Sequence, residues 1–119
     1  MDEERGGPTL LSSKTVDRAL IIFLEGELDL HTAPPFKEYI DKELANNLDI
    51  KDLVLQMDKI KFIDSSGLGV ILGRYKLIKE RGGRLIFVTC SPQVYRILKL
   101  SGMQKIAYFT DSVKEALSL

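Results

Sequence analysis

The chain has 119 residues, 45% of them hydrophobic, a size and composition typical of one globular domain with a core of ordinary depth. Lys and Arg together number 17, as do Asp and Glu, so no net charge favours direct binding to nucleic acid or to an anionic membrane. A single cysteine, Cys90, excludes an intramolecular disulfide, and with a single histidine, His31, it leaves no set of zinc ligands.

The first residues predict a tail and no targeting segment. Residues 1–8 lack apolar periodicity, so we expect a mobile N-terminal tail followed by one domain over residues 9–119. The longest unbroken apolar run, Ala19 to Leu24, is far shorter than the roughly 18 residues that a membrane span needs. Met1 to Glu4 have no secretory character. We therefore expect a cytoplasmic protein without a membrane partner.

Two strands joined by a tight turn are predicted at the start of the domain. Thr9 to Val16 and Ala19 to Leu28 flank the polar pair Asp17-Arg18. The run Leu20 to Leu24 is typical of a strand buried on both faces. We expect this second strand to lie at the centre of the sheet.

The first helix is predicted over Thr32 to Asn46. Thr32 is expected to cap it, and Pro34 and Pro35 suit its first turn. The apolar residues that share one face of this helix are Phe36, Tyr39, Ile40 and Leu44.

A second buried strand begins at Leu53 and is extended by Ile60 and Phe62 towards Asp64. The helix that follows runs to about Arg81. Its predicted packed face consists of Leu68, Ile71, Leu72, Tyr75 and Ile78.

Glycines and cations distinguish this second helix. Gly67, Gly69 and Gly73 each cost roughly 1 kcal/mol against alanine in a helix interior. Close packing on the sheet or the approach of a partner must therefore justify them. The cations, which we expect to form a solvated face near the end of the helix, are Arg74, Lys76, Lys79 and Arg81.

The last third of the chain predicts strand, helix, strand and helix. Leu85 to Val88 form a buried strand, and Ser91, followed by a proline, caps the next helix. Ile106 to Phe109 form the last strand, and Ser112 with Glu115 matches a capping box for a terminal helix. The chain thus predicts an α/β fold: one domain with a mixed, largely parallel sheet and about four helices.

Parallel strands bring three polar loops to one edge of the predicted sheet. The strands that end near Leu28, Ile63 and Val88 are followed by Asp29, Ser65 and Ser91 respectively. Open α/β sheets usually place their sites at the carboxyl ends of such strands. At the middle loop, Asp64 or Ser65 can cap the free N–H groups of the helix, and the helix N-terminus suits an anion such as a phosphate. A capped helix start alone also explains the run Asp64-Ser65-Ser66-Gly67.

The longer stretch Phe62 to Lys76 resembles the signature of anti-sigma-factor antagonists, the bacterial members of the STAS domain family. Gly26 to Asp29, Ser91-Pro92 and Ser101 to Met103 resemble the same family, in the expected order along the chain. The resemblance covers nearly all of the chain beyond about residue 9. It implies a single STAS-type domain.

The resemblance also implies a function. By this resemblance we expect the first serine after the aspartate, Ser65, to be phosphorylated by a partner that is both an anti-sigma factor and a serine kinase. The unmodified chain is then expected to bind that partner and free the sigma factor, and a serine phosphatase is expected to remove the phosphate. We expect a monomer when the chain is free. The residues expected to form the partner-binding surface are Asp29, Asp64, Ser65, Ser66, Gly67, Leu68, Gly69 and Ser91.

The same residues do not fit the common hydrolase and nucleotide-binding motifs. A hydrolase would need a G-x-S-x-G elbow and a histidine after the serine, whereas His31 precedes it. No phosphate-binding G-x-x-x-x-G-K-[ST] loop is present. We therefore expect neither an enzyme nor a cofactor. The alternatives that stay open are a STAS module of a general-stress partner-switching pathway and a STAS module that binds a small molecule or nucleotide.

Overall fold

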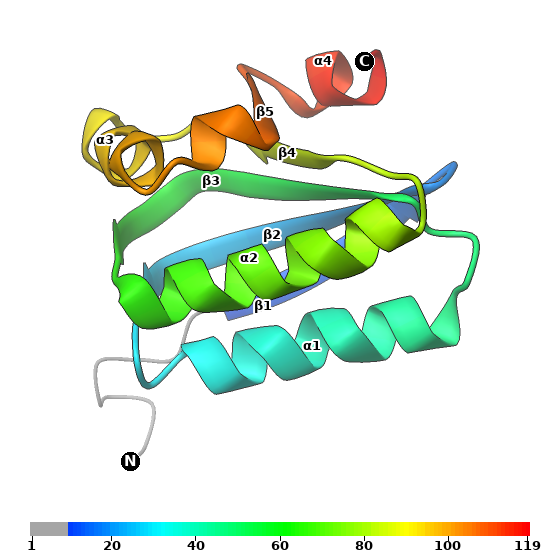
Figure 1. Cartoon of the computed structure of the whole chain (residues 1–119), viewed down its shortest axis with the longest axis horizontal. Coiled ribbons are helices and arrows are strands. Elements are labelled where there is room, and N and C mark those ends of the chain that lie inside the picture. The colour runs from blue at the N-terminus through cyan, green and yellow to red at the C-terminus, as the bar shows by residue number, and fades with distance from the viewer. Residues whose placement is uncertain (1–9) are drawn as a thin grey trace.

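A five-stranded sheet forms the centre of the computed structural model, which describes residues 10–119 (Figure 1). Its strands lie in the order of the chain: β1 (Leu10–Val16), β2 (Ala19–Leu28), β3 (Asp52–Ile63), β4 (Leu85–Val88) and β5 (Ala107–Thr110). β1 is antiparallel to β2, and every other neighbouring pair is parallel. The predicted α/β fold with a mixed, largely parallel sheet is confirmed. The predicted tail, residues 1–8, and Thr9 lie outside the described residues.

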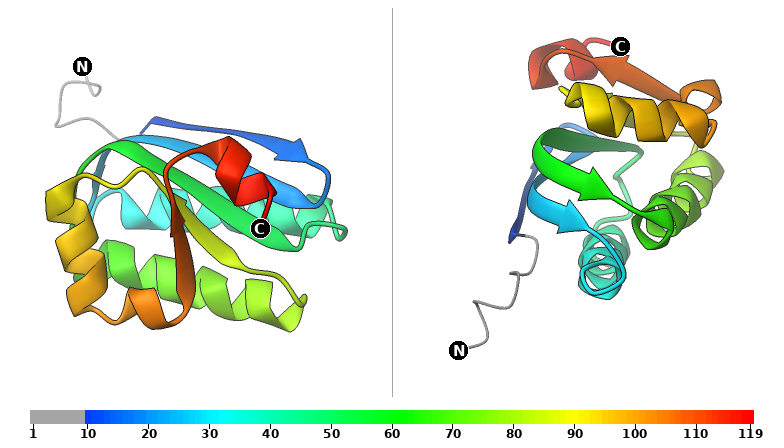
Figure 2. Two further views of the ribbon diagram at one scale, coloured as in Figure 1. Left: turned by 90° about the horizontal axis from the view of Figure 1, so that it is seen from above. Right: turned by 90° about the vertical axis from the view of Figure 1, so that its left-hand side faces the viewer.

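Within residues 10–119, four α-helices connect and cover the strands, as the sequence predicts. They are α1 (Ala33–Asn46), α2 (Ser65–Glu80), α3 (Pro92–Leu100) and α4 (Val113–Leu117), and a 3-10 turn, η2 (Met103–Lys105), follows α3. α1, α2 and α3 share one buried cluster with one face of the sheet, whereas α4 packs on the opposite face (Figure 2). No described helix has the length and apolar character to cross a bilayer.

β3, and not β2, is the centre of the sheet. The β1–β2 hairpin occupies one edge of β2, so each later parallel strand can only be added on the other side. β3 therefore lies between β2 and β4, and its Leu53, Val54 and Leu55 are completely buried.

Two phenylalanines predicted to be buried are exposed. Phe23 is 36% exposed because it points to the outer face of the sheet, where α4 covers a neighbouring region. Phe62 is 45% exposed because a bulge at Lys61 shifts the alternation of β3, so that Ile60 and Ile63 both face the core.

Thr32 does not cap α1. The usual donors to a capping side chain are the second and third N–H groups of the helix, and here these positions are Pro34 and Pro35, which have no N–H. The Thr32 hydroxyl instead donates to the carbonyl of Glu27 at 2.7 Å and accepts from the N–H of Asp29 at 2.9 Å. Thr32 thus stabilises the loop that precedes the helix.

The packed face of α2 also differs from the prediction. Leu72 is 42% exposed, while Arg74 is 9% exposed and buried. Arg74 Nε lies 3.0 Å from Asp41 Oδ1 of α1. Arg81 donates to main-chain carbonyl groups at the end of α1 and just beyond it, so neither arginine belongs to a solvated face.

Candidate functional site

At the start of α2, Asp64 caps the helix and its neighbour Ser65 carries an exposed hydroxyl. Asp64 Oδ1 accepts from the N–H groups of Ser66 and Gly67 at 2.8 and 3.1 Å, so Asp64 is the cap. Ser65 is the first residue of the helix, it is exposed, and its hydroxyl makes no hydrogen bond within the described part of the chain. Ser66 is half-buried. Ser65 therefore presents a free hydroxyl at a helix N-terminus.

Gly67 fixes the position of this turn on the sheet. A Cβ atom at Gly67 would lie 2.7 Å from the carbonyl oxygen and 2.9 Å from Cβ of Leu28, at the end of β2. The N–H of Asp64 donates to that same carbonyl at 3.0 Å. Only glycine allows this approach. Because Gly67 is buried, it positions the first turn of α2 against β2 and offers a partner little direct contact.

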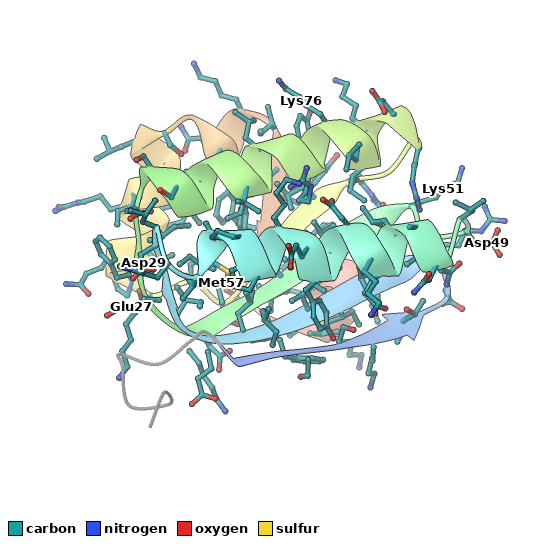
Figure 3. The ribbon with its side chains drawn as sticks, turned by 90° about the horizontal axis from the view of Figure 1, so that it is seen from below. Glu27, Asp29, Asp49, Lys51, Met57 and Lys76 are labelled. Carbon is teal, nitrogen blue, oxygen red and sulfur yellow. The ribbon has the colours of Figure 1, made fainter. Side chains whose placement is uncertain are left out.

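Asp29 lies in the loop that leaves β2, beside the start of α2. Its Oδ1 accepts from the N–H groups of His31 and Thr32 at 2.9 and 3.1 Å. These hydrogen bonds, that of Thr32 above all, lower the pKa of Asp29 against a smaller opposing effect of desolvation. Figure 3 shows Glu27 and Asp29 at the end of the molecule where α1 and α2 begin, and Asp49 and Lys51 at the opposite end.

Ser91 caps α3, as the sequence predicts. Its hydroxyl accepts from the N–H of Val94 at 3.2 Å. Pro92 and Gln93 line the same hollow as Lys61 and Phe62, which places the start of α3 beside the end of β3. The loops after β2, β3 and β4 thus emerge at one edge of the sheet, although the Ser91 hydroxyl is engaged as a cap.

One face of α2 is open to solvent next to Ser65. A Cβ atom at Gly69 or at Gly73 would meet nothing within 4 Å. We define the open α2 face by the residues at helical spacing from Ser65, namely Ser65, Gly69, Leu72, Gly73 and Lys76. The sequence analysis assigned Leu72 to the packed face and not to the partner-binding surface. Its position seven residues after Ser65 nevertheless places both residues on one side of a helix.

Other chemistry has no support among the described residues. They contain no cluster of three His, Cys, Asp or Glu side chains that could hold a metal ion. Burial raises the pKa of the Cys90 thiol to about 12, which makes it a poor nucleophile at neutral pH.

Comparison with known proteins gives one consistent family. A sequence model of the STAS domain matches residues 11–116. An anti-sigma F factor antagonist of Paenibacillus polymyxa is 41% identical over 99 residues, which cover 83% of this chain and 84% of that protein. An anti-sigma-B factor antagonist of Listeria monocytogenes is 32% identical over 87 residues, covering 71% of this chain and 73% of that protein.

The fold comparison agrees with the sequence comparison. The solved structure of the anti-sigma factor antagonist SpoIIAA in its unphosphorylated form superposes with a TM-score of 0.79 at 27% identity. The superposition covers 91% of this chain and 93% of SpoIIAA.

Proposed function

The chain belongs to the STAS domain family, and from this membership we propose that it is an anti-sigma-factor antagonist. It binds an anti-sigma factor that is also a serine kinase, and this binding frees the sigma factor to activate transcription. The kinase phosphorylates Ser65, which ends the interaction, and a serine phosphatase removes the phosphate and restores it.

The observation that carries this proposal is the free Ser65 hydroxyl. Because Asp64 already caps α2, a phosphate on Ser65 breaks no hydrogen bond in the fold. The N-terminus of α2 accommodates the added negative charge. The chain supplies only the acceptor oxygen, while ATP, Mg²⁺ and the group that accepts the proton belong to the kinase. The chain is accordingly a binding protein and not an enzyme.

The contact surface explains how one phosphate switches binding. Phosphorylation adds a charge of about −1.5 to −2 beside Asp64, in the middle of the surface that the partner covers. Desolvating that charge opposes complex formation. Direct contacts come from the residues of this edge that retain exposed surface, which are Asp29, Asp64, Ser65, Ser66, Leu68, Gly69 and Ser91, and from Leu72 on the open α2 face.

The identities of the relatives favour a sporulation-type pathway over a general-stress pathway. The relative named for sigma F is 41% identical, and the relative named for sigma B in Listeria monocytogenes is 32% identical. We therefore place the chain in a sporulation-type pathway and keep a general-stress pathway as the second candidate.

Displacement of a sigma factor tests the function. The anti-sigma factor encoded by the source organism is purified in complex with its sigma factor, and the chain is added in unmodified or in phosphorylated form. We expect the unmodified chain to release the sigma factor and the phosphorylated chain to leave the complex intact, as followed by size-exclusion chromatography. Failure of the unmodified chain to bind the anti-sigma factor would contradict the proposal.

A further inference from the structure

The hollow that Pro92 and Gln93 share with Lys61 and Phe62 lies between the end of β3 and α3. It has a volume of about 530 Å³. We call it the β3–α3 groove, and the residues that line it are Lys61, Phe62, Pro92, Gln93, Arg96 and Ile97. Its apolar part comes from Phe62, which is 45% exposed, from Pro92 and from the half-buried Ile97.

The charged residues that line the β3–α3 groove are all positive. Lys61 and Arg96 are its only charged lining residues, and both are exposed. Among the described residues, no carboxylate lies within ion-pair distance of either cation. The chain as a whole has no net charge, so these two cations form a local feature. Cations beside an exposed aromatic ring suit an acidic segment with an apolar side chain.

The β3–α3 groove continues the surface around Ser65. Phe62 lies three positions before Ser65 in the chain, so their Cα atoms are at most roughly 11 Å apart. A typical protein interface covers about 800 Å² on each partner and extends well beyond that distance. A protein that covers the Ser65 hydroxyl is therefore large enough to reach this groove as well.

We propose that the β3–α3 groove receives an acidic segment of the anti-sigma factor, which places an aromatic or aliphatic side chain on Phe62 and its carboxylates beside Lys61 and Arg96. This inference rests on the proposed function and extends it from α2 to α3. It assigns Lys61, Phe62 and Arg96 to partner recognition.

Matched variants test the charges. Arg96→Gln is paired with Lys99→Gln, which removes an exposed cation elsewhere on α3, and Lys61→Gln is paired with Lys59→Gln on β3. Calorimetry with the purified anti-sigma factor gives each dissociation constant at low and at high salt. We expect each groove variant to bind about fivefold more weakly at low salt, with a reduced salt dependence, and each control to stay within about twofold of wild type.

The aromatic contact has its own matched pair. Phe62→Ser should weaken binding about tenfold, whereas Phe23→Ser, at an exposed phenylalanine on the outer face of the sheet, should not. Melting temperatures of all six variants show whether the domain is folded.

Several results would overturn this inference. Equal effects of the groove and control cations would mean that only overall charge matters, and unchanged binding of Phe62→Ser would remove the apolar anchor. Shifts of the Lys61 and Phe62 NMR signals on titration of the free chain with ADP, without any loss of partner affinity in the variants, would identify a nucleotide site instead.

If Gly73→Ala weakens the complex while the groove variants do not, the groove inference fails and the proposed function stands. If wild type does not bind the anti-sigma factor, the function itself fails.

Discussion

At the scale of single residues, the first turn of α2 separates the residue that holds the structure from the residue that can be modified. Asp64 satisfies two N–H groups of the helix, and Gly67 seats the turn against Leu28. Ser65 contributes to neither contact. This separation allows the charge at Ser65 to change while the fold stays intact.

The kinase should therefore modify Ser65 and not Ser66. Ser65 is exposed with an unengaged hydroxyl, whereas Ser66 is half-buried in the same turn. Incubation of the chain with the purified anti-sigma kinase and ATP, followed by mass-spectrometric mapping, identifies the modified residue. Phosphate on Ser66 alone would show that the assignment is wrong.

Substitution of Ser65 should change binding without changing stability. Ser65→Asp places a carboxylate near the partner and should weaken the complex, while Ser65→Ala should bind like wild type and resist inactivation by ATP. Neither variant removes a hydrogen bond, so the free energy of unfolding should stay within about 1 kcal/mol of wild type. Calorimetric titration and thermal denaturation measure both quantities. Equal affinity of Ser65→Asp and wild type would count against charge as the switch.

The glycines of α2 should respond to alanine in opposite ways. Gly69→Ala and Gly73→Ala place a methyl group in open space, so each should stabilise the domain by about 0.4–1 kcal/mol and weaken partner binding. Gly67→Ala forces a methyl group against the Leu28 carbonyl and should destabilise by about 1–3 kcal/mol. Melting temperatures and calorimetry separate the two classes. Stable Gly69→Ala and Gly73→Ala variants with wild-type affinity would remove this face from the interface.

At the scale of elements, α1 and α2 are locked together where both helices end. Arg81 donates to the carbonyl oxygens of Leu44, Asn47 and Ile50 at 2.7, 3.1 and 3.0 Å. One guanidinium group thus satisfies carbonyls at the end of α1 and in the loop that leads to β3. The buried Arg74, paired with Asp41, joins the same two helices nearer their middle.

Arg81→Gln should therefore destabilise the domain by about 2–3 kcal/mol, because it leaves partly buried carbonyls without a charged donor. Lys76→Gln, at an exposed position of α2, should change the free energy of unfolding by less than about 0.5 kcal/mol. Urea denaturation of both variants gives the comparison. A similar loss in the two variants would show that the Arg81 hydrogen bonds do not contribute.

Elements that depend on local sequence signals could be predicted, whereas features that depend on tertiary contacts could not. Local signals placed the strands and helices closely: Asp64 and Ser91 act as caps, and the periodicity located Ile71 and Ile78 in the core. Contacts with the rest of the fold decided what local signals could not. Leu72 was expected to be buried and Arg74 to be exposed, but the reverse is found, because Asp41 of α1 lies opposite α2 and pairs with Arg74. The β3–α3 groove joins residues some 30 positions apart, and the sequence analysis did not assign its residues to the site.

At the scale of the whole molecule, the edges of the sheet and its exposed apolar residues limit self-association. The edge strand β5 has four residues, and the middle of β1 is polar, with Ser12, Ser13 and Lys14. The most exposed leucines of the described residues are Leu48, between α1 and β3, and Leu100, at the end of α3, so they belong to different parts of the fold. Short or polar edges and scattered apolar residues disfavour pairing between copies.

The free chain should therefore be a monomer. Sedimentation equilibrium at micromolar concentration should give a mass close to 13.4 kDa that does not change with concentration. A mass that rises towards twice this value as the concentration increases would contradict the prediction. The unmodified and phosphorylated forms should behave alike, since Ser65 follows the central strand β3 and does not lie on the edge strands β1 and β5.

The central place of β3 also sets the order in which the sheet can assemble during synthesis on the ribosome. Until the residues of β3 have emerged, the nascent chain can form only the β1–β2 hairpin and α1, and an isolated two-stranded hairpin is marginally stable. Once Asp52–Ile63 are available, β2 gains a parallel partner, and the other side of β3 is ready to pair with β4 when that strand follows. Nascent chains should accordingly change from protease-sensitive to protected only after β3 has left the exit tunnel.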